Sequence, residues 1–239
     1  MIRKIIELFE VPTNHRVVEI GPGDGALTKE LYELYQDLHA IEIDERAVNY
    51  LREQMPGIKI HQMDIRDVDW NKLAHDDQSI HVIGNIPYNL TSPILFNILS
   101  ARERLQDAML MIQKEVGERL VAPTHTKDYG ILSVQVQLMS NVEKLLEVPP
   151  EVFSPPPRVD SLVVRLKFNQ PSLKCTDQHL KTVVRTAFNQ RRKKIKNALE
   201  PVMGSFKPDN FDIHRRPEEI PPGEYEMLTV QLERNGILT

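Results

Sequence analysis

The chain has 239 residues, 41% of them apolar and 27% charged, with a formal net charge of −4. This length suits one sizeable domain with a small appendage, and the composition is ordinary for a soluble globular protein. No apolar run approaches the roughly 20 residues that cross a bilayer, which excludes a membrane-spanning helix. Cys175 is the only cysteine, which excludes an intrachain disulfide. We therefore expect a cytoplasmic protein without a membrane partner.

Apolar runs and helical patterns alternate over the first 170 residues. Residues 1–10 mix apolar and charged side chains as an amphipathic helix does, unlike a signal peptide. Periodicity then predicts strands at 16–20, 38–43, 58–63, 79–83 and 108–112, with helices at 26–35, 45–54 and 93–100. This order predicts parallel β-α-β units in a doubly wound α/β sheet.

The pattern changes after the fifth predicted strand. A helix is predicted at 129–139, followed by strands at 143–147 and 161–168 that a proline-rich loop separates. Two late strands close together predict an antiparallel hairpin at the sheet edge. Beyond Pro171 the spacing is only helical, with helices predicted at 177–188, 192–201 and 222–235. We place the domain boundary between a sheet domain at 1–170 and a helical domain at 171–239.

A glycine-rich turn follows the first predicted strand. Gly21 and Gly23 permit a tight turn and close approach of a ligand to the backbone. Glu42 ends the second strand, where a carboxylate can accept hydrogen bonds from both ribose hydroxyls of a nucleoside. Two alternatives remain at this point. Glu42 or Asp44 can cap the next helix, and a nicotinamide cofactor explains the glycines and Glu42 nearly as well.

Asp64 ends the third predicted strand. Its carboxylate can accept from an adenine amino group, and the neighbouring Ile65 offers an apolar surface to the ring. Parallel strands deliver such residues to the carboxyl edge of the sheet, where open α/β sheets bind ligands. Glu19 and Ile43, which flank the glycines and Glu42, complete the predicted cofactor set.

Asn85-Ile86-Pro87-Tyr88 follows the fourth predicted strand and resembles the signature of amino-directed methyltransferases. The Asn85 side-chain oxygen and the Ile86 carbonyl can accept both N–H bonds of an exocyclic amine and aim its lone pair at a methyl donor. Pro87 fixes the backbone, and Tyr88 can stack on a base. The reaction then relies on proximity and orientation, so we expect no metal. The alternative is a proline turn with an Asn helix cap.

Three longer segments carry a more specific resemblance: residues 85–94, 148–161 and 187–193. Together they resemble the KsgA family of small-subunit rRNA adenine dimethyltransferases. The resemblance implies a Rossmann-like class I methyltransferase sheet at 1–170 that binds S-adenosylmethionine, with Asn85 beside both cofactor and target. It also implies N6,N6-dimethylation of two adjacent adenines near the 3′ end of 16S rRNA during ribosome biogenesis.

The resemblance assigns two further sets of residues. Phe153 matches the aromatic residue that sandwiches the target base with Tyr88, as enzymes acting on flipped bases do; otherwise it would plug the sheet edge. The helical domain is expected to contact rRNA and the small ribosomal subunit, with the chain as a monomer. The candidate RNA-binding residues are Arg191, Arg192, Lys193, Lys194 and Lys196, which otherwise form a solvated helix face.

Family members usually begin with a segment containing Gly-Gln-Asn/His-Phe-Leu, which closes over the cofactor. This chain starts inside the helix that is expected to follow that segment. Two other functions remain open from the sequence. One is an Erm-type methyltransferase that modifies large-subunit rRNA, and the other is a non-catalytic ribosome-assembly or transcription factor that kept the fold.

Overall fold

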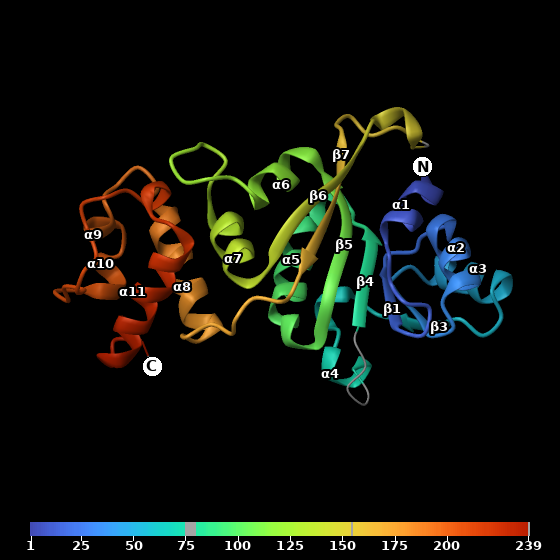
Figure 1. The fold of residues 1–239 in the computed structure, drawn as a ribbon, viewed down its shortest axis with the longest axis horizontal. Coiled ribbons are helices and arrows are strands. Elements are labelled where there is room, and N and C mark those ends of the chain that lie inside the picture. Colours follow the sequence, from blue (N-terminus) through green and yellow to red (C-terminus); the bar gives the residue numbers. More distant parts are fainter. Residues whose placement is uncertain (75–79, 154, 239) are drawn as a thin grey trace. The chain divides into compact units, whose positions relative to one another are not determined.

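The computed structural model describes residues 1–74, 80–153 and 155–238, which form two compact units (Figure 1). The first unit contains Met1–Gly117 and Asn141–Asn169. The second contains Glu118–Ser140 and the chain from Gln170 onward. One division between these units falls at residues 169–170, and residues 118–140 group with the second, helical unit. Helical periodicity shows that a segment is amphipathic, but it does not show which core buries its apolar face.

A mixed sheet organises the first unit. Its strands in the described part of the chain are β1 (Arg16–Ile20), β2 (Leu38–Glu42), β3 (Lys59–Gln62), β4 (Ile80–Asn85), β5 (Leu105–Gln113), β6 (Asn141–Val148) and β7 (Ser161–Lys167). The strand order is β3-β2-β1-β4-β5-β7-β6. All pairings are parallel except those of β7, which runs antiparallel to β5 and β6. The predicted α/β class and edge hairpin are confirmed.

Strand burial explains why apolar runs in the sequence predicted the strands. Every residue of β1 is buried, because strands in the middle of a parallel sheet are covered on both faces. The edge strand β6 is only partly buried over most of its length. The order reverses at β1, which pairs with β2 on one side and β4 on the other. Open sheets bind ligands at the carboxyl ends of the strands at such a reversal.

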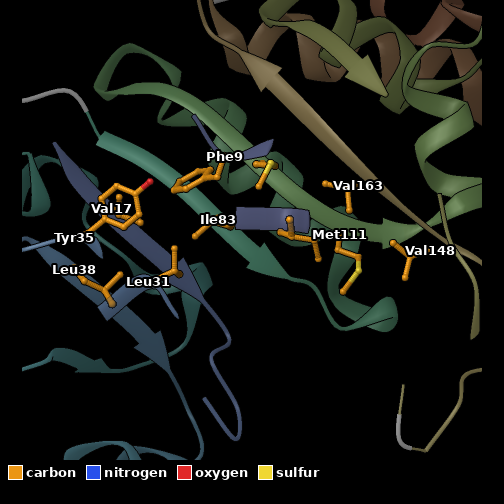
Figure 2. Packing of buried hydrophobic residues seen from close by; sticks show 11 residues of the cluster. Phe9, Val17, Leu31, Tyr35, Leu38, Ile83, Met111, Val148 and Val163 are labelled. Carbon is orange, nitrogen blue, oxygen red and sulfur yellow. The ribbon is translucent and has the colours of Figure 1, made fainter. Parts of the chain in front are cut away.

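Several helices of the first unit begin and end close to their predicted positions: α1 (Ile2–Leu8), α2 (Ala26–Leu34), α3 (Glu45–Gln54) and α5 (Thr91–Ser100). The sequence analysis did not predict α4 (Trp70–Leu73) or α6 (Lys114–Leu120), which runs into the second unit. Phe9 and Tyr35 belong to an apolar cluster with residues of β1, β4, β5, β6 and β7 (Figure 2). Their rings meet edge to face, with centroids 5.9 Å apart. Ser79, the first residue of the fourth predicted strand, lies outside the described residues.

The second unit is helical. It contains α7 (Ile131–Met139), α8 (Asp177–Asn189), α9 (Ile195–Ala198), α10 (Glu200–Met203) and α11 (Pro222–Arg234). Tyr129 and Tyr225 are fully buried, and their hydroxyls donate to the carbonyls of Ile220 (2.7 Å) and Pro217 (2.9 Å). Buried hydroxyls that find carbonyl partners fix the loop before α11 to the core. No helix among the described residues is long and apolar enough to span a bilayer.

The predicted helix at 192–201 is wrong. Residues 190–193 form a turn, and two short helices follow with a break at Leu199. Pro201 lies within the first turn of α10, a position where its missing N–H removes no helical hydrogen bond. Most of the basic run therefore lies in the segment between α8 and α9, and only Lys196 lies on α9.

Candidate active site

The carboxyl ends of β1 and β4 bring two predicted motifs together. Ile20 pairs with Gly84, so Gly21 and Asn85 are the next residues on adjacent strands. A Cβ atom on Gly21 would lie 3.9 Å from the carbonyl oxygen of Asn85. The glycine turn and the tetrapeptide thus form neighbouring walls of one region of the sheet edge.

Positive backbone angles explain the glycines of the turn. Gly21 has φ of 66° and Gly23 has φ of 55°, in the left-handed region that side chains disfavour. The Gly23 N–H donates to Glu42 Oε2 at 3.2 Å. Glu42 Oε1 accepts from the N–H groups of Ile43 (2.8 Å) and Asp44 (2.9 Å). Backbone N–H groups of the glycine turn and of the residues that follow β2 therefore hold the Glu42 carboxylate in place.

Glu42 is not the residue that caps the helix after it. The N-cap of α3 is Asp44, whose side chain accepts from the Arg46 N–H at 2.9 Å. A carboxylate has about four acceptor positions, and the Glu42 bonds to the backbone occupy three of them. Glu42 keeps one position for a ligand, and its long bond from Gly23 is the easiest to exchange for a bond from a ligand hydroxyl.

Asp64 has a partner that the sequence did not predict. Its carboxylate accepts from the Arg66 N–H at 2.8 Å and from the Arg66 guanidinium at 3.0 Å. These hydrogen bonds and the charge of Arg66 lower the pKa of Asp64 to about 2. Asp64 therefore remains an ionised acceptor near neutral pH, but the four bonds from Arg66 fill its acceptor positions, so a ligand amino group binds there only by displacing Arg66.

Apolar surface near these carboxylates comes mainly from two other residues. Ile65 is only 7% exposed, so little of its side chain is free to contact a ring. Ile43 is 64% exposed and Met63 is 38% exposed. These two follow β2 and β3, which are adjacent in the sheet. Exposed apolar side chains beside polar acceptors favour a site for an aromatic ring. Met63 was missed by the sequence analysis.

Glu19 is a buried carboxyl at the end of β1. It is 2% exposed, and within the described residues its Oε2 atom has no hydrogen-bond partner. Burial, together with a smaller contribution from the charge of Glu42, raises the pKa of Glu19 to about 8. A buried acceptor without a partner next to a glycine turn fits a polar or cationic ligand group.

The raised pKa of Glu19 predicts a pH-dependent stability. The protonated form is favoured in the folded state, so this contribution is full below pH 4.5 and is lost as pH rises to about 8. At pH 8.5 we expect the free energy of unfolding of Glu19→Gln, measured by urea denaturation, to exceed that of the unchanged chain by roughly 2 kcal/mol or more. The difference should shrink at pH 4.5. Glu33→Gln, an exposed position on α2, is the control, and equal pH profiles for all three proteins would contradict this account.

A cleft of about 280 Å³ surrounds the tetrapeptide. Its lining comprises Asn85, Ile86, Pro87, Tyr88, Phe153, Pro155 and Pro157. The Asn85 side chain is exposed to it, whereas Ile86 is buried and its N–H donates to the Met111 carbonyl at 3.0 Å. This bond fixes the peptide before the Ile86 carbonyl. The two predicted acceptors therefore project from a backbone that the sheet holds in place.

Two aromatic residues line this cleft. The Tyr88 hydroxyl lies 2.8 Å from Ser161 Oγ at the start of β7. Phe153 follows a short helix at Pro150–Val152, and its N–H donates to the Pro150 carbonyl at 3.1 Å. Phe153 also packs against the apolar cluster of Figure 2. Phe153 therefore both packs against the core and lines the cleft, and its stacking on a target base stays a prediction. Ser161 was missed by the sequence analysis.

The candidate RNA-binding residues lie in the second unit and divide into two groups. Arg191 is used internally, because its guanidinium donates to the carbonyls of Thr126 (2.8 Å) and Lys127 (2.7 Å) and pairs with Glu218 at 3.1 Å. The exposed group comprises Arg192, Lys193, Lys194 and Lys196. Three of these residues precede α9 and Lys196 lies in its first turn, and we call the four together the cationic turn; residues 192–196 contain no acidic residue.

The chain matches the family model of the ribosomal RNA adenine dimethylases over residues 1–216. It belongs to this family. The match confirms the predicted family and enzyme class, and S-adenosylmethionine is the methyl donor, as predicted.

Comparisons with individual proteins are consistent with this family. The chain is 43% identical to the ribosomal RNA small subunit methyltransferase A of Salinibacter ruber, over 99% of this chain and 81% of that protein. It is 40% identical to the protein of the same description from Prosthecochloris aestuarii, over 95% and 87%. A dimethyladenosine transferase from Plasmodium falciparum has the same fold, with a TM-score of 0.80 and 24% identity over 98% and 96% of the chains. The 23S rRNA methyltransferase ErmE has a TM-score of 0.67 and 25% identity, over 97% and 96%.

Proposed function

We propose that this chain dimethylates N6 of two adjacent adenines near the 3′ end of 16S rRNA in the small ribosomal subunit. We further propose that it acts in the cytoplasm as a monomer. The cleft carries the proposal, because Asn85 and Ile86 acceptors lie in it with Tyr88 and Phe153, next to the glycine turn. The two relatives described above are named for the small subunit, which supports this choice of substrate.

The chain's own residues make the amine reactive. The lone pair of an adenine amine is delocalised into the ring, so the amine is a poor nucleophile. Two acceptors, Asn85 Oδ1 and the Ile86 carbonyl, bind its two N–H groups and favour a pyramidal nitrogen. Tyr88 and Phe153 hold the base plane, and the Tyr88–Ser161 bond limits rotation of one ring. S-adenosylmethionine supplies an electrophilic methyl group.

The donor is expected to be held by residues at the ends of β1, β2 and β3. Glu42 accepts from the ribose, Asp64 accepts from the adenine amine, and Ile43 and Met63 cover the ring. Glu19 lies in β1 two residues before Gly21, and among the described residues it has an unpartnered oxygen that suits a polar or cationic group of the ligand. This set supports S-adenosylmethionine, whose nucleoside and charged amino-acid portions need acceptors of these kinds.

Two acceptors also suit two successive methylations. A monomethylated amine keeps one N–H, which either Asn85 or the Ile86 carbonyl can accept. A dimethylated amine has no N–H and loses both bonds. The site therefore retains the intermediate better than the final product, since an acceptor that the bound base covers and that has lost its hydrogen bond is costly.

The proposal is tested by methyl transfer to isolated ribosomal components. We expect incorporation of labelled methyl groups into unmodified small subunits and none into protein-free large-subunit RNA. Mass spectrometry of the RNA should find dimethyladenine at adjacent positions. Methylation of the large-subunit RNA alone would instead assign an Erm-type activity. Binding of subunits without any transfer would assign a non-catalytic role in assembly.

The cationic turn gives a separate prediction. Changing Arg192, Lys193, Lys194 and Lys196 together to glutamine should weaken small-subunit binding and flatten its salt dependence. Loss of three or four phosphate contacts should reduce the slope of log affinity against log salt by about 3. Changing the three lysines to arginine keeps the charge and serves as the control. An unchanged slope in the glutamine variant would remove the turn from the RNA interface.

A further inference from the structure

A second cavity adjoins the segment that carries Phe153. This segment joins β6 to β7 and is olive to gold in Figure 1. The cavity has a volume of about 360 Å³. Its lining comprises Gln113, Lys114, Glu115, Pro150, Arg158, Val159 and Asp160. All of these belong to the first unit, and none of them lines the target cleft or has a role in the proposed methyl transfer.

The two cavities are lined by residues that are adjacent in the chain or connected through paired strands. Pro157 lines the target cleft and Arg158, the next residue, lines the second cavity. Gln113 pairs with Ser161, whose hydroxyl contacts Tyr88. Along β5, Gln113 lies two residues beyond Met111, the partner of Asn85, which is about 7 Å along the strand. That separation is on the scale of one nucleotide of an RNA strand.

The second cavity is lined by two cations, an amide and two carboxylates, and its Arg158 and Gln113 side chains are the groups that fit a nucleotide. Arg158 is exposed, and its guanidinium has no hydrogen-bond or ion-pair partner within the described ranges. Lys114 is paired with Glu147 at 2.7 Å, so Arg158 is the more available cation. A guanidinium donates two parallel bonds to a phosphate. Gln113 is half-buried at the end of β5, and a glutamine amide matches the donor and acceptor pattern of adenine.

We propose that this second cavity binds the nucleotide adjacent to the target adenine in the same RNA strand. Arg158 neutralises its phosphate, and Gln113 reads the edge of its base, which is the other adenine of the pair. This inference rests on the proposed function and deepens it. In this proposal the second cavity makes the enzyme select target adenines whose neighbour in the strand is also an adenine.

The test uses small subunits assembled from unmodified 16S rRNA. Three RNAs are compared: one with both adenines, and two in which either adenine is replaced by uracil. We expect Arg158→Gln to lower kcat/KM about tenfold on all three RNAs, since a charged hydrogen bond is lost. Arg158→Lys should recover part of this loss. Arg52→Gln makes the same charge change at an exposed position of α3 and should leave the rate unchanged.

Gln113→Ala tests recognition of the base. We expect one of the two uracil substitutions to slow methylation of the remaining adenine by the unchanged chain. On that RNA Gln113→Ala should cause no further loss, whereas on the two-adenine RNA it should slow the reaction severalfold. Thermal melting and S-adenosylmethionine binding should stay unchanged in both variants, which separates loss of RNA recognition from misfolding.

The outcomes distinguish the two proposals. Wild-type rates for both Arg158→Gln and Gln113→Ala on the two-adenine RNA would overturn the second site while leaving the methyltransferase assignment intact. Equal additional losses from Gln113→Ala on all three RNAs would overturn its reading of the base. Failure of the unchanged chain to methylate any of the three RNAs would overturn the proposed function and this inference with it.

Discussion

Replacing Asn85 with alanine should slow methyl transfer by about a hundredfold or more, a loss typical of removing one positioned hydrogen-bonding group. The side chain is exposed to the target cleft, and its backbone lies beside the glycine turn. Alanine removes one of the two acceptors that orient the amine, while the Ile86 carbonyl remains. S-adenosylmethionine binding should be largely intact, because Glu19, Glu42 and Asp64 are unchanged.

Single-turnover transfer to small subunits measures this effect separately from subunit binding. Asn49→Ala is the matched control, since Asn49 is exposed on α3 and lies outside the proposed site. The control should react at the rate of the unchanged chain. Turnover of Asn85→Ala at that same rate would show that this side chain does not orient the amine, and the chemical assignment of the tetrapeptide would be lost.

The sheet was predictable because its strands carry local signals. β1 was predicted at its observed bounds, and the helix at 45–54 coincides with α3. The apolar pattern predicts both elements, and α3 is also indicated by Asp44, which caps it with its own side chain. The helix at 192–201 failed because its apolar spacing continued across a turn. That turn is held by bonds from Arg191 to Thr126 and Lys127, which are distant in sequence.

The site was predictable to the extent that strand ends determine it. Glu42 and Asn85 end β2 and β4, and Asp64 follows β3, so a parallel sheet brings them to one edge. Pairings of side chains within loops were not predictable. Arg66 binds Asp64 only two residues away, but any flexible arginine has many such options. Ser161 contacts Tyr88 across 73 positions, and nothing in either local sequence indicates this contact.

Glycine at position 84 explains how β1 and β4 approach closely enough to form the site. A Cβ atom there would lie 2.7 Å from the backbone oxygen of Ile20 and 3.1 Å from Cδ1 of Ile86. Real Cβ atoms do not come this close to a backbone oxygen, so the strands would have to separate. We therefore expect Gly84→Ala to destabilise the fold by about 1–3 kcal/mol, as overpacked substitutions do.

The same substitution should impair catalysis beyond its effect on stability. Ile86 supplies one acceptor and Asn85 the other, and both directly follow position 84 in the chain. A shift of the order of 1 Å in a catalytic group can cost about a hundredfold in rate. We expect methyl transfer by the folded fraction of Gly84→Ala to fall by at least about tenfold, measured below its melting temperature in single-turnover assays. S-adenosylmethionine affinity should also fall, because Gly21 lies beside the displaced backbone.

Gly223→Ala provides the matched comparison. A Cβ at Gly223, near the start of α11, meets nothing within 4 Å. Alanine is favoured over glycine in a helix by roughly 0.5–1 kcal/mol, so this variant should be as stable as the unchanged chain or more so. If Gly84→Ala instead melted and turned over like Gly223→Ala, β1 and β4 would not be held together at this distance. The close approach of the glycine turn to the tetrapeptide would then not be what positions the two acceptors.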